Sequence, residues 1–222
     1  MSAAARGRGR RPRSATALVL FAGVVAASVL GAGLRDATAS SALRLEVADL
    51  ARASEVVIVG RVEATRAEWN SAGTGIHTLV TVRVAEVVAR TEGTPSAALV
   101  PGQTVEVLTR GGVVGDMGMT VLGAAELRTG EEVVLFLERL GPRLGAVGWA
   151  QGKWALAPVP PPAAPGAPPA TLAPDDRLCV SAAGAFSLMA RGPDGALVPV
   201  PPPGARTLRT LKAEVRAARG AR

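Results

Sequence analysis

The stretch Thr78-Leu79-Val80-Thr81-Val82-Arg83-Val84-Ala85-Glu86-Val87-Val88 predicts the fold class of this chain. In an extended chain, four valines point to one side and three other residues to the opposite side: Val80, Val82, Val84 and Val88 against Thr81, Arg83 and Ala85. An alternation with a period of two is typical of a β-strand that has one face on a core and the other in water. The stretch therefore predicts a strand at the surface of a β-rich domain.

A second predicted strand precedes this one. The residues from Glu55 to Val62 are rich in β-branched side chains, which favour strands. The cluster Asn70-Ser71-Ala72-Gly73-Thr74-Gly75 is typical of a turn. We therefore expect a long hairpin of Val56–Trp69 with Ile76–Val88.

More strands are expected farther along the chain, at Thr104–Leu108, Val133–Leu137 and Ala146–Leu156. The second of these is apolar on both faces, so we expect it at the centre of a sheet. Gln151-Gly152 interrupts the third, and we expect a β-bulge there, with Trp149 and Trp154 in the core. Short strands separated by Gly and Pro favour a small barrel or sandwich.

Apolar residues recur at helical spacing at both ends of this region. Leu43–Ala53 is expected to be a short helix, and Thr207–Arg219, within the C-terminal segment 204–222, an amphipathic one. The basic face of the C-terminal helix is expected either in solvent or against anionic lipid or cell-wall polymer. That face consists of Arg209, Lys212, Arg216 and Arg219.

The composition divides the chain into consecutive segments. Residues 43–157 form the expected β core with its leading helix. Between residues 157 and 174, eight of eighteen residues are proline, which excludes ladders and helices, so 158–174 is expected to be an extended insertion or linker. Additional short strands are expected within 175–200, namely Arg177–Ser181, Ala185–Ala190 and Ala196–Val200.

The first 39 residues have the pattern of a secretory signal peptide. Arginines crowd the first thirteen residues, Ala15–Leu34 carries no charge, and Ala37-Thr38-Ala39 places small residues at positions −3 and −1 of a cleavage site. We expect cleavage after Ala39 and export to the periplasm or the medium. The alternative is that residues 15–34 remain as a membrane anchor, since they are about long enough to span a bilayer.

The basic charge of the chain lies mostly in this N-terminal segment. Residues 40–222 keep 19 of the 25 bases and 17 of the 18 acids, a net charge of +2. A nucleic-acid-binding domain needs a basic stripe on its folded surface. The charge balance therefore argues against a nucleic-acid partner.

Cysteine and histidine usage limits the chemistry further. Cys179 is the only cysteine, so no intramolecular disulfide can form. We expect a small buried residue there, with an intermolecular disulfide or a reactive thiol as the alternative. A zinc site needs several converging ligands, and the chain offers one His and one Cys. We therefore expect no metal site and no cofactor.

His77 is the one residue that suggests catalysis. A serine hydrolase would use it as a general base beside a nucleophile and an orienting acid. The chain has no G-x-S-x-G nucleophile elbow, however. We expect His77 to be a polar residue at the edge of a strand, and no catalytic residue is predicted.

The glycine-rich run from Arg110 to Met119 is the best candidate for a binding surface, because recognition tends to lie on loops. It lacks the Lys and Ser/Thr that a phosphate-binding loop needs at fixed offsets. We expect a bulged loop after the third strand, in which glycine permits a positive φ. The candidate binding residues are Arg110, Gly112, Gly115, Asp116, Met117 and Gly118.

Four segments of the chain carry a resemblance: Ala53–Val62, Thr81–Val84, Gly130–Leu137 and Ala150–Trp154. Their order resembles a family of uncharacterised secreted proteins from bacteria such as myxobacteria, over about residues 43–157. That resemblance implies no activity. More distantly, the layout is similar to the netrin/tissue-inhibitor-of-metalloproteinase module, which implies an OB-like five-stranded barrel. Those inhibitors use an N-terminal cysteine and bracing disulfides, and this chain has neither.

These patterns together predict a mainly β fold: a small OB-like barrel or sandwich with a short N-terminal helix and a C-terminal helix. We expect an exported, non-catalytic binding or structural protein whose partner is a protein or an envelope polymer. The alternatives are a secreted hydrolase that uses His77 and a partner or inhibitor of a secreted protease.

Overall fold

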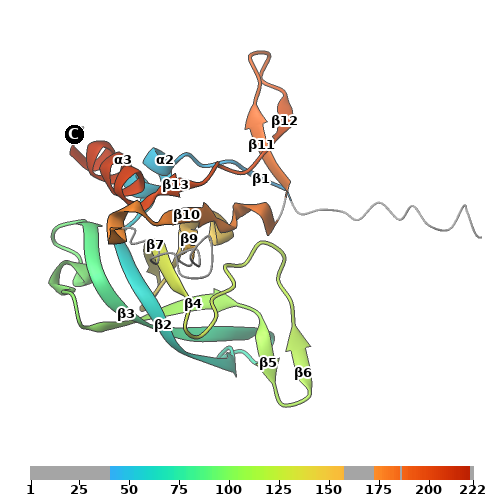
Figure 1. Cartoon of the computed structure of the whole chain (residues 1–222). Helices are drawn as coiled ribbons and strands as arrows, with labels where there is room; N and C mark the ends of the chain where they lie inside the picture. The colour runs from blue at the N-terminus through green and yellow to red at the C-terminus, as the bar shows by residue number, and fades with distance from the viewer. Residues whose placement is uncertain (1–40, 158–172, 186, 221–222) are drawn as a thin grey trace, which may run out of the picture. The chain divides into compact units, whose positions relative to one another are not determined.

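The computed structural model describes residues 41–157, 173–185 and 187–220. They form a mainly β structure with a short N-terminal helix and a longer C-terminal one, as the sequence predicted (Figure 1). The helices are α2 (Val47–Ala53) and α3 (Leu208–Gly220). The expected signal peptide, residues 1–39, and the proline-rich residues 158–172 lie outside the described part of the chain.

The strands follow one another along the chain, separated by short 3-10 turns. The strands are β1 (Ser41–Leu43), β2 (Val56–Trp69), β3 (Ile76–Arg90), β4 (Thr104–Arg110), β5 (Gly112–Val114), β6 (Met117–Met119), β7 (Glu132–Leu140), β8 (Arg143–Ala146), β9 (Lys153–Leu156), β10 (Leu178–Ser181), β11 (Ser187–Arg191), β12 (Leu197–Val200) and β13 (Arg206–Thr207). The 3-10 turns are η1 (Pro95–Ala98), η2 (Trp149–Gly152), η3 (Pro174–Asp176) and η4 (Ala182–Ala185).

β2 and β3 form the expected long hairpin. Val80, Val82 and Val84 are buried on a common face, as predicted. Val88, predicted on that face as well, instead packs in a different core cluster. The reason is the register shift between the pairs Gly60–Val84 and Val59–Glu86, because Ala85 is an extra residue of β3 there and moves the side chains that follow it to the opposite face.

The sheet pairings join five strands in a closed ring. β2 pairs with β3, β3 with β4, β4 with β8, β8 with β7, and β7 with β2. All of these pairs are antiparallel except β4 with β8, which is parallel. The ring is therefore not a simple meander, because its last strand, β8, lies between β4 and β7.

One hydrophobic core cluster lies inside this ring, and every strand of the ring contributes to it. A second cluster lies on the outer face of β2 and β7, beneath α2 and α3, which lie side by side (Figure 1). The first cluster contains Val56, Ile58, Val62, Val80, Val82, Val84, Val107, Leu127, Val133, Leu135, Leu137 and Leu144.

β7 contributes to both clusters, which confirms the expected central strand. Leu135 belongs to the cluster inside the ring, whereas Val134 and Phe136 belong to the outer cluster. None of the three is more than 1% exposed. This double burial is the reason that the sequence of β7 is apolar at consecutive positions rather than at alternate ones.

Of the strand expected at 146–156, residues 147–152 are not strand; β8 ends at Ala146 and β9 begins at Lys153, and both pair with the same edge of β7. β8 pairs with the C-terminal half of β7, and β9 with its N-terminal half. The break is a 3-10 turn, η2, rather than a β-bulge. Trp154 is fully buried as predicted, but the prediction that Trp149 lies in the core is wrong, because its side chain is 46% exposed in the turn.

The helix predicted from Leu43 begins later, at Val47. Glu46 and Asp49 form a capping box at its start, in which each side chain meets the backbone amide at the other position. The preceding residues Ser41–Leu43 form β1, which pairs in parallel with β11. Local spacing cannot reveal this pairing, because the partner strand lies near the other end of the chain.

The three short strands expected after residue 175 are present. β10 pairs with β9 and β13, and β11 pairs with β12 as a hairpin (Figure 1).

Within the described residues, neither helix has the length and apolar character needed to cross a bilayer.

Candidate functional site

Trp149 lies in η2, where the backbone has an unusual conformation. Gly148 and Trp149 have left-handed φ angles of 59° and 64°. Within the described part of the chain, Trp149 is the only residue other than glycine with a positive φ. Such a conformation costs a bulky residue about 1–3 kcal/mol and persists only where the surroundings enforce it.

Three hydrogen bonds to two other segments hold this turn. The amide of Ala150 donates to the carbonyl of Gly123 at 2.9 Å. The Oε1 atom of the buried Gln151 accepts from the amide of Leu45 at 2.8 Å, and its Nε2 atom donates to the carbonyl of Leu43 at 3.0 Å. The turn is therefore fixed on several sides, and the indole of Trp149 is presented by a rigid support.

The residues that follow in the motif Gln151-Gly152-Lys153-Trp154 are structural as well. A Cβ atom at Gly152 would lie 2.5 Å from the carbonyl oxygen of Val147, so only glycine fits. Lys153 is 7% exposed, and its Nζ lies 2.7 Å from Oε1 of Glu131. The motif thus interrupts the strand and allows the backbone of Gly152 to pack closely against that of Val147.

Trp149 lines two hollows at the surface. One is a pocket of about 80 Å³, and the other is a groove of about 500 Å³. The pocket is lined by Leu108, Thr109, Arg110, Ala124, Ala125, Glu138, Leu140, Ala146 and Trp149. The groove is lined by Ser41, Ala42, Leu43, Leu45, Val121, Leu122, Gly148, Trp149 and Gln151. We call these two hollows together the Trp149 surface.

The pocket follows from the register of three neighbouring strands of the ring. Gly145 on β8 pairs with Leu108 on β4 and with Glu138 on β7. Since Gly145 has no side chain, Leu140 packs over it, where a Cβ atom would collide. The result is a shallow floor between Leu108 and Glu138.

Two charged groups face this pocket without a salt-bridge partner in the described part of the chain. The guanidinium of Arg110 lies 5.5 Å from the ring centroid of Trp149, a cation–π contact. Glu138 is partly buried and makes no hydrogen bond or ion pair with the described residues. Its burial raises the pKa of the Glu138 carboxyl.

Of the six residues predicted to form a binding loop, only Arg110 lines the Trp149 surface. The others belong to the hairpin of β5 and β6, which extends from the ring (Figure 1). Gly112 lies in β5, Gly115 and Asp116 in the turn, and Met117 and Gly118 in β6. The expected bulged loop is thus a short hairpin, with Met117 58% exposed.

His77 lies beside an acidic side chain. Its Nε2 atom lies 3.0 Å from Oε1 of Glu68, and this hydrogen bond lowers the pKa of the Glu68 carboxyl. Glu68 is also close to two arginines, at 2.6 Å from Arg66 and 3.6 Å from Arg143. Among the described residues, no hydroxyl group makes a hydrogen bond with the His77 side chain, and neither His77 nor Asp116 lines the Trp149 surface.

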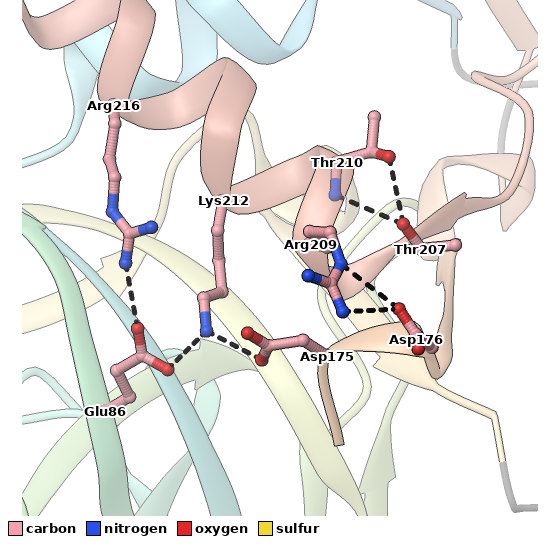
Figure 2. A network of polar contacts seen from close by, with 8 residues as sticks. All are labelled: Glu86, Asp175, Asp176, Thr207, Arg209, Thr210, Lys212 and Arg216. Atoms are coloured by element: carbon pink, nitrogen blue, oxygen red, sulfur yellow. Dashed lines mark hydrogen bonds and ion pairs between the residues drawn. The ribbon is translucent and has the colours of Figure 1, made fainter. Parts of the chain in front are cut away.

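A buried lysine of α3 forms the centre of an ionic network (Figure 2). The Nζ atom of Lys212 donates to Oε2 of Glu86 at 2.7 Å and to Oδ1 of Asp175 at 2.8 Å. Burial alone would lower the pKa of Lys212, but the two carboxylates raise it above its usual value. Arg216 donates to the other oxygen of Glu86 at 3.1 Å. This network holds α3 on β3 and η3.

The prediction that Lys212 belongs to a basic face in solvent is therefore wrong, since the residue is 6% exposed. The carboxylates that draw it inward come from distant parts of the chain, so the helical periodicity of α3 could not reveal them. Arg209 and Arg216 are exposed, as expected, with side chains 65% and 56% accessible.

Cys179 is fully buried in the outer core cluster, as the sequence predicted. Burial raises the pKa of its thiol to about 11. In the part of the chain that the structure describes, His, Cys, Asp and Glu side chains form no group of three or more that could hold a metal ion.

Sequence reasoning missed Trp149, Glu138 and the groove. A tryptophan preceded by glycine in a broken strand is a weak signal, because the same pattern fits a core residue. Comparison with family models, with curated proteins and with solved structures gave no match. Function is therefore inferred from the geometry of the chain itself.

Proposed function

We propose that this chain is an exported, non-catalytic binding protein of the cell envelope, and that it engages its ligand through the Trp149 surface. The observation that carries this proposal is the conformation of Trp149. A large apolar side chain is kept half-exposed by a strained backbone, next to a pocket and a groove.

The energetic reasoning supports a binding role. The exposed part of the indole gains no burial energy, and its left-handed backbone has a cost, so the fold gains less from Trp149 than from a buried tryptophan. Strained residues cluster at ligand sites, and tryptophan is the residue type most enriched at binding hot spots.

Co-sedimentation of the purified protein with washed cell envelopes of the producing bacterium tests the proposal. Trp149→Ala is expected to weaken sedimentation at least tenfold, since loss of a central aromatic side chain typically costs about 2 kcal/mol or more. Trp69→Ala is the matched control, because Trp69 is 42% exposed and lines none of the pockets described. Equal sedimentation of Trp149→Ala and the parent protein would contradict the proposal.

A second variant tests whether strain is retained for function. Trp149→Gly removes the indole and also relieves the left-handed strain, so it is expected to lose binding while unfolding at the same or a higher urea concentration than Trp149→Ala. A Trp149→Gly protein that is less stable than Trp149→Ala would show that the backbone is not strained.

We also propose that the ring of five strands is an OB-type barrel. A Greek-key barrel of five strands is the pattern of that fold, and the ring here has five strands with β8 inserted between β4 and β7. The zinc-chelating cysteine and the disulfides of the netrin-like inhibitors have no counterpart in this chain, so their mechanism is not part of the proposal.

Export itself is part of the proposal, supported by the signal-peptide pattern of residues 1–39. β1 begins at Ser41, two residues after Ala39. N-terminal sequencing of the protein recovered from the periplasm or the medium is expected to begin at Ser40. A chain that keeps residues 15–34 and stays with the membrane would support the anchored alternative.

A further inference from the structure

We propose that the Trp149 surface binds a glycolipid, with an uncharged sugar head group in the pocket and an alkyl chain in the groove. This inference rests on the proposed function, because it names the ligand class of the same surface.

The charges of the pocket favour a neutral polar group. Arg110 can only donate hydrogen bonds, and an ionised Glu138 can only accept them. An anion in the pocket would meet the carboxylate of Glu138, and a cation would meet the guanidinium of Arg110. A hydroxyl group both donates and accepts, so a ring with neighbouring hydroxyls satisfies both side chains without leaving a charge unbalanced.

The indole of Trp149 favours a ring over a flexible chain in this position. A pyranose has an apolar C–H face and a rim of hydroxyls, so it can cover the part of the indole that Arg110 leaves exposed while its hydroxyls reach polar neighbours. Thr109 adds a further hydroxyl to the wall of the pocket. The pocket, at about 80 Å³, takes up only part of a sugar ring, so the rest of the sugar would stay in solvent.

The groove is different in character, because its walls are almost wholly apolar. Leu43 and Leu122 are 52% and 57% exposed there. Both ends of the amide of Gln151 are already bonded, to Leu45 and Leu43, so Gln151 offers little to a polar ligand. An unbranched alkyl chain fits such a groove, since it needs no hydrogen-bond partner.

Trp149 lines both the pocket and the groove, which brings a subsite with two charged side chains and an apolar groove together at one side chain. A ligand that fills both must have a sugar at one end and an alkyl chain at the other. A free sugar fills only the pocket, and a fatty acid brings an anion to Glu138.

Isothermal titration calorimetry with octyl β-D-glucopyranoside, kept below its critical micelle concentration, tests the proposal. Lengthening the chain from hexyl to octyl is expected to tighten binding about fourfold per methylene while the groove takes up the chain. Octyl sulfate and octyltrimethylammonium, with the same chain and a charged head, are expected to bind at least tenfold more weakly.

Variants assign the two parts of the ligand to the two hollows. Leu122→Ser is expected to make the affinity depend less on alkyl chain length, while the protein still binds the glucoside head group more tightly than the charged ones. Glu138→Gln leaves the charge of Arg110 unbalanced. The affinity for octyl sulfate is therefore expected to rise at least tenfold relative to the affinity for octyl glucoside. Both changes are at surface positions, and Trp69→Ala again serves as the control that should bind like the parent protein.

Two results would overturn the proposal: the absence of any heat of binding with the glucoside series, or equal affinity for all three head groups. In either case, loss of envelope sedimentation in Trp149→Ala would leave the proposed binding function standing with another ligand. If Trp149→Ala sediments normally but its affinity for octyl glucoside falls, the proposed envelope function fails and the glycolipid site stands.

Discussion

The buried lysine of α3 provides a prediction about how this fold is stabilised. The side chain of Lys212 is 7% exposed, whereas those of its partners Glu86 and Asp175 are 36% and 43% exposed (Figure 2). If the lysine is removed, both carboxylates can still be hydrated. If the carboxylates are neutralised, the ammonium stays buried without a countercharge. We therefore predict that the two perturbations have very different effects.

The magnitudes follow from this asymmetry. Glu86→Gln combined with Asp175→Asn should destabilise the protein by about 3 kcal/mol, the lower end of what an uncompensated buried charge costs, because the amide oxygens still accept hydrogen bonds. Lys212→Met keeps the apolar stem and removes the buried charge, so it should cost about 1 kcal/mol or less. For a chain of this size these values correspond to roughly 6–12 °C and roughly 2–4 °C in Tm.

Urea unfolding followed by circular dichroism measures the free energies directly. Asp176→Asn is the control within the same network, because the pair of Arg209 with Asp176 is 65% and 43% exposed and should contribute less than about 1 kcal/mol. If Lys212→Met is as destabilising as the double variant, the ammonium supplies net stability and the reasoning from burial is wrong.

Two further predictions concern a glycine and an acid. Gly152→Ala should destabilise the fold by about 1–3 kcal/mol, since a Cβ atom would lie 2.5 Å from the carbonyl oxygen of Val147, whereas Gly184→Ala, with no atom within 4 Å, should melt like the parent protein. The hydrogen bond from Arg139 lowers the pKa of Glu55 to about 2, against an ordinary value of 4.5, so its contribution to stability is present above pH 4.5 and disappears as the pH falls to 2. Urea midpoints measured across that window should fall more steeply for the parent protein than for Glu55→Gln, and parallel curves would refute the assignment.

Local sequence patterns were sufficient for the elements whose partners lie nearby. The hairpin of β2 and β3 needs only alternating valines and a turn, and the consecutive apolar residues of β7 reveal a strand buried on both faces. Cys179 could be placed in the core because nothing near it in sequence suggested reactivity.

Features that depend on distant partners could not be predicted in this way. Closure of the ring depends on the parallel pairing of Val107 with Leu144 and Leu108 with Gly145, for which no local pattern exists. Lys212 is buried because Glu86 and Asp175 neutralise it, and Trp149 is exposed because Gln151 and Gly123 hold its turn. In both cases tertiary contacts outweigh the usual preference of lysine for solvent and of tryptophan for the core.

The pairing of β1 with β11 has a consequence for the order in which the chain can fold. All strands of the ring lie between Val56 and Ala146, so the ring can close before the later residues leave the ribosome or a translocation pore. β1 can pair only after Ser187–Met189 are available, and α2, which also contacts β7, packs against α3 only after the last residues have been made. The first described segment of the chain is thus among the last to reach its final place.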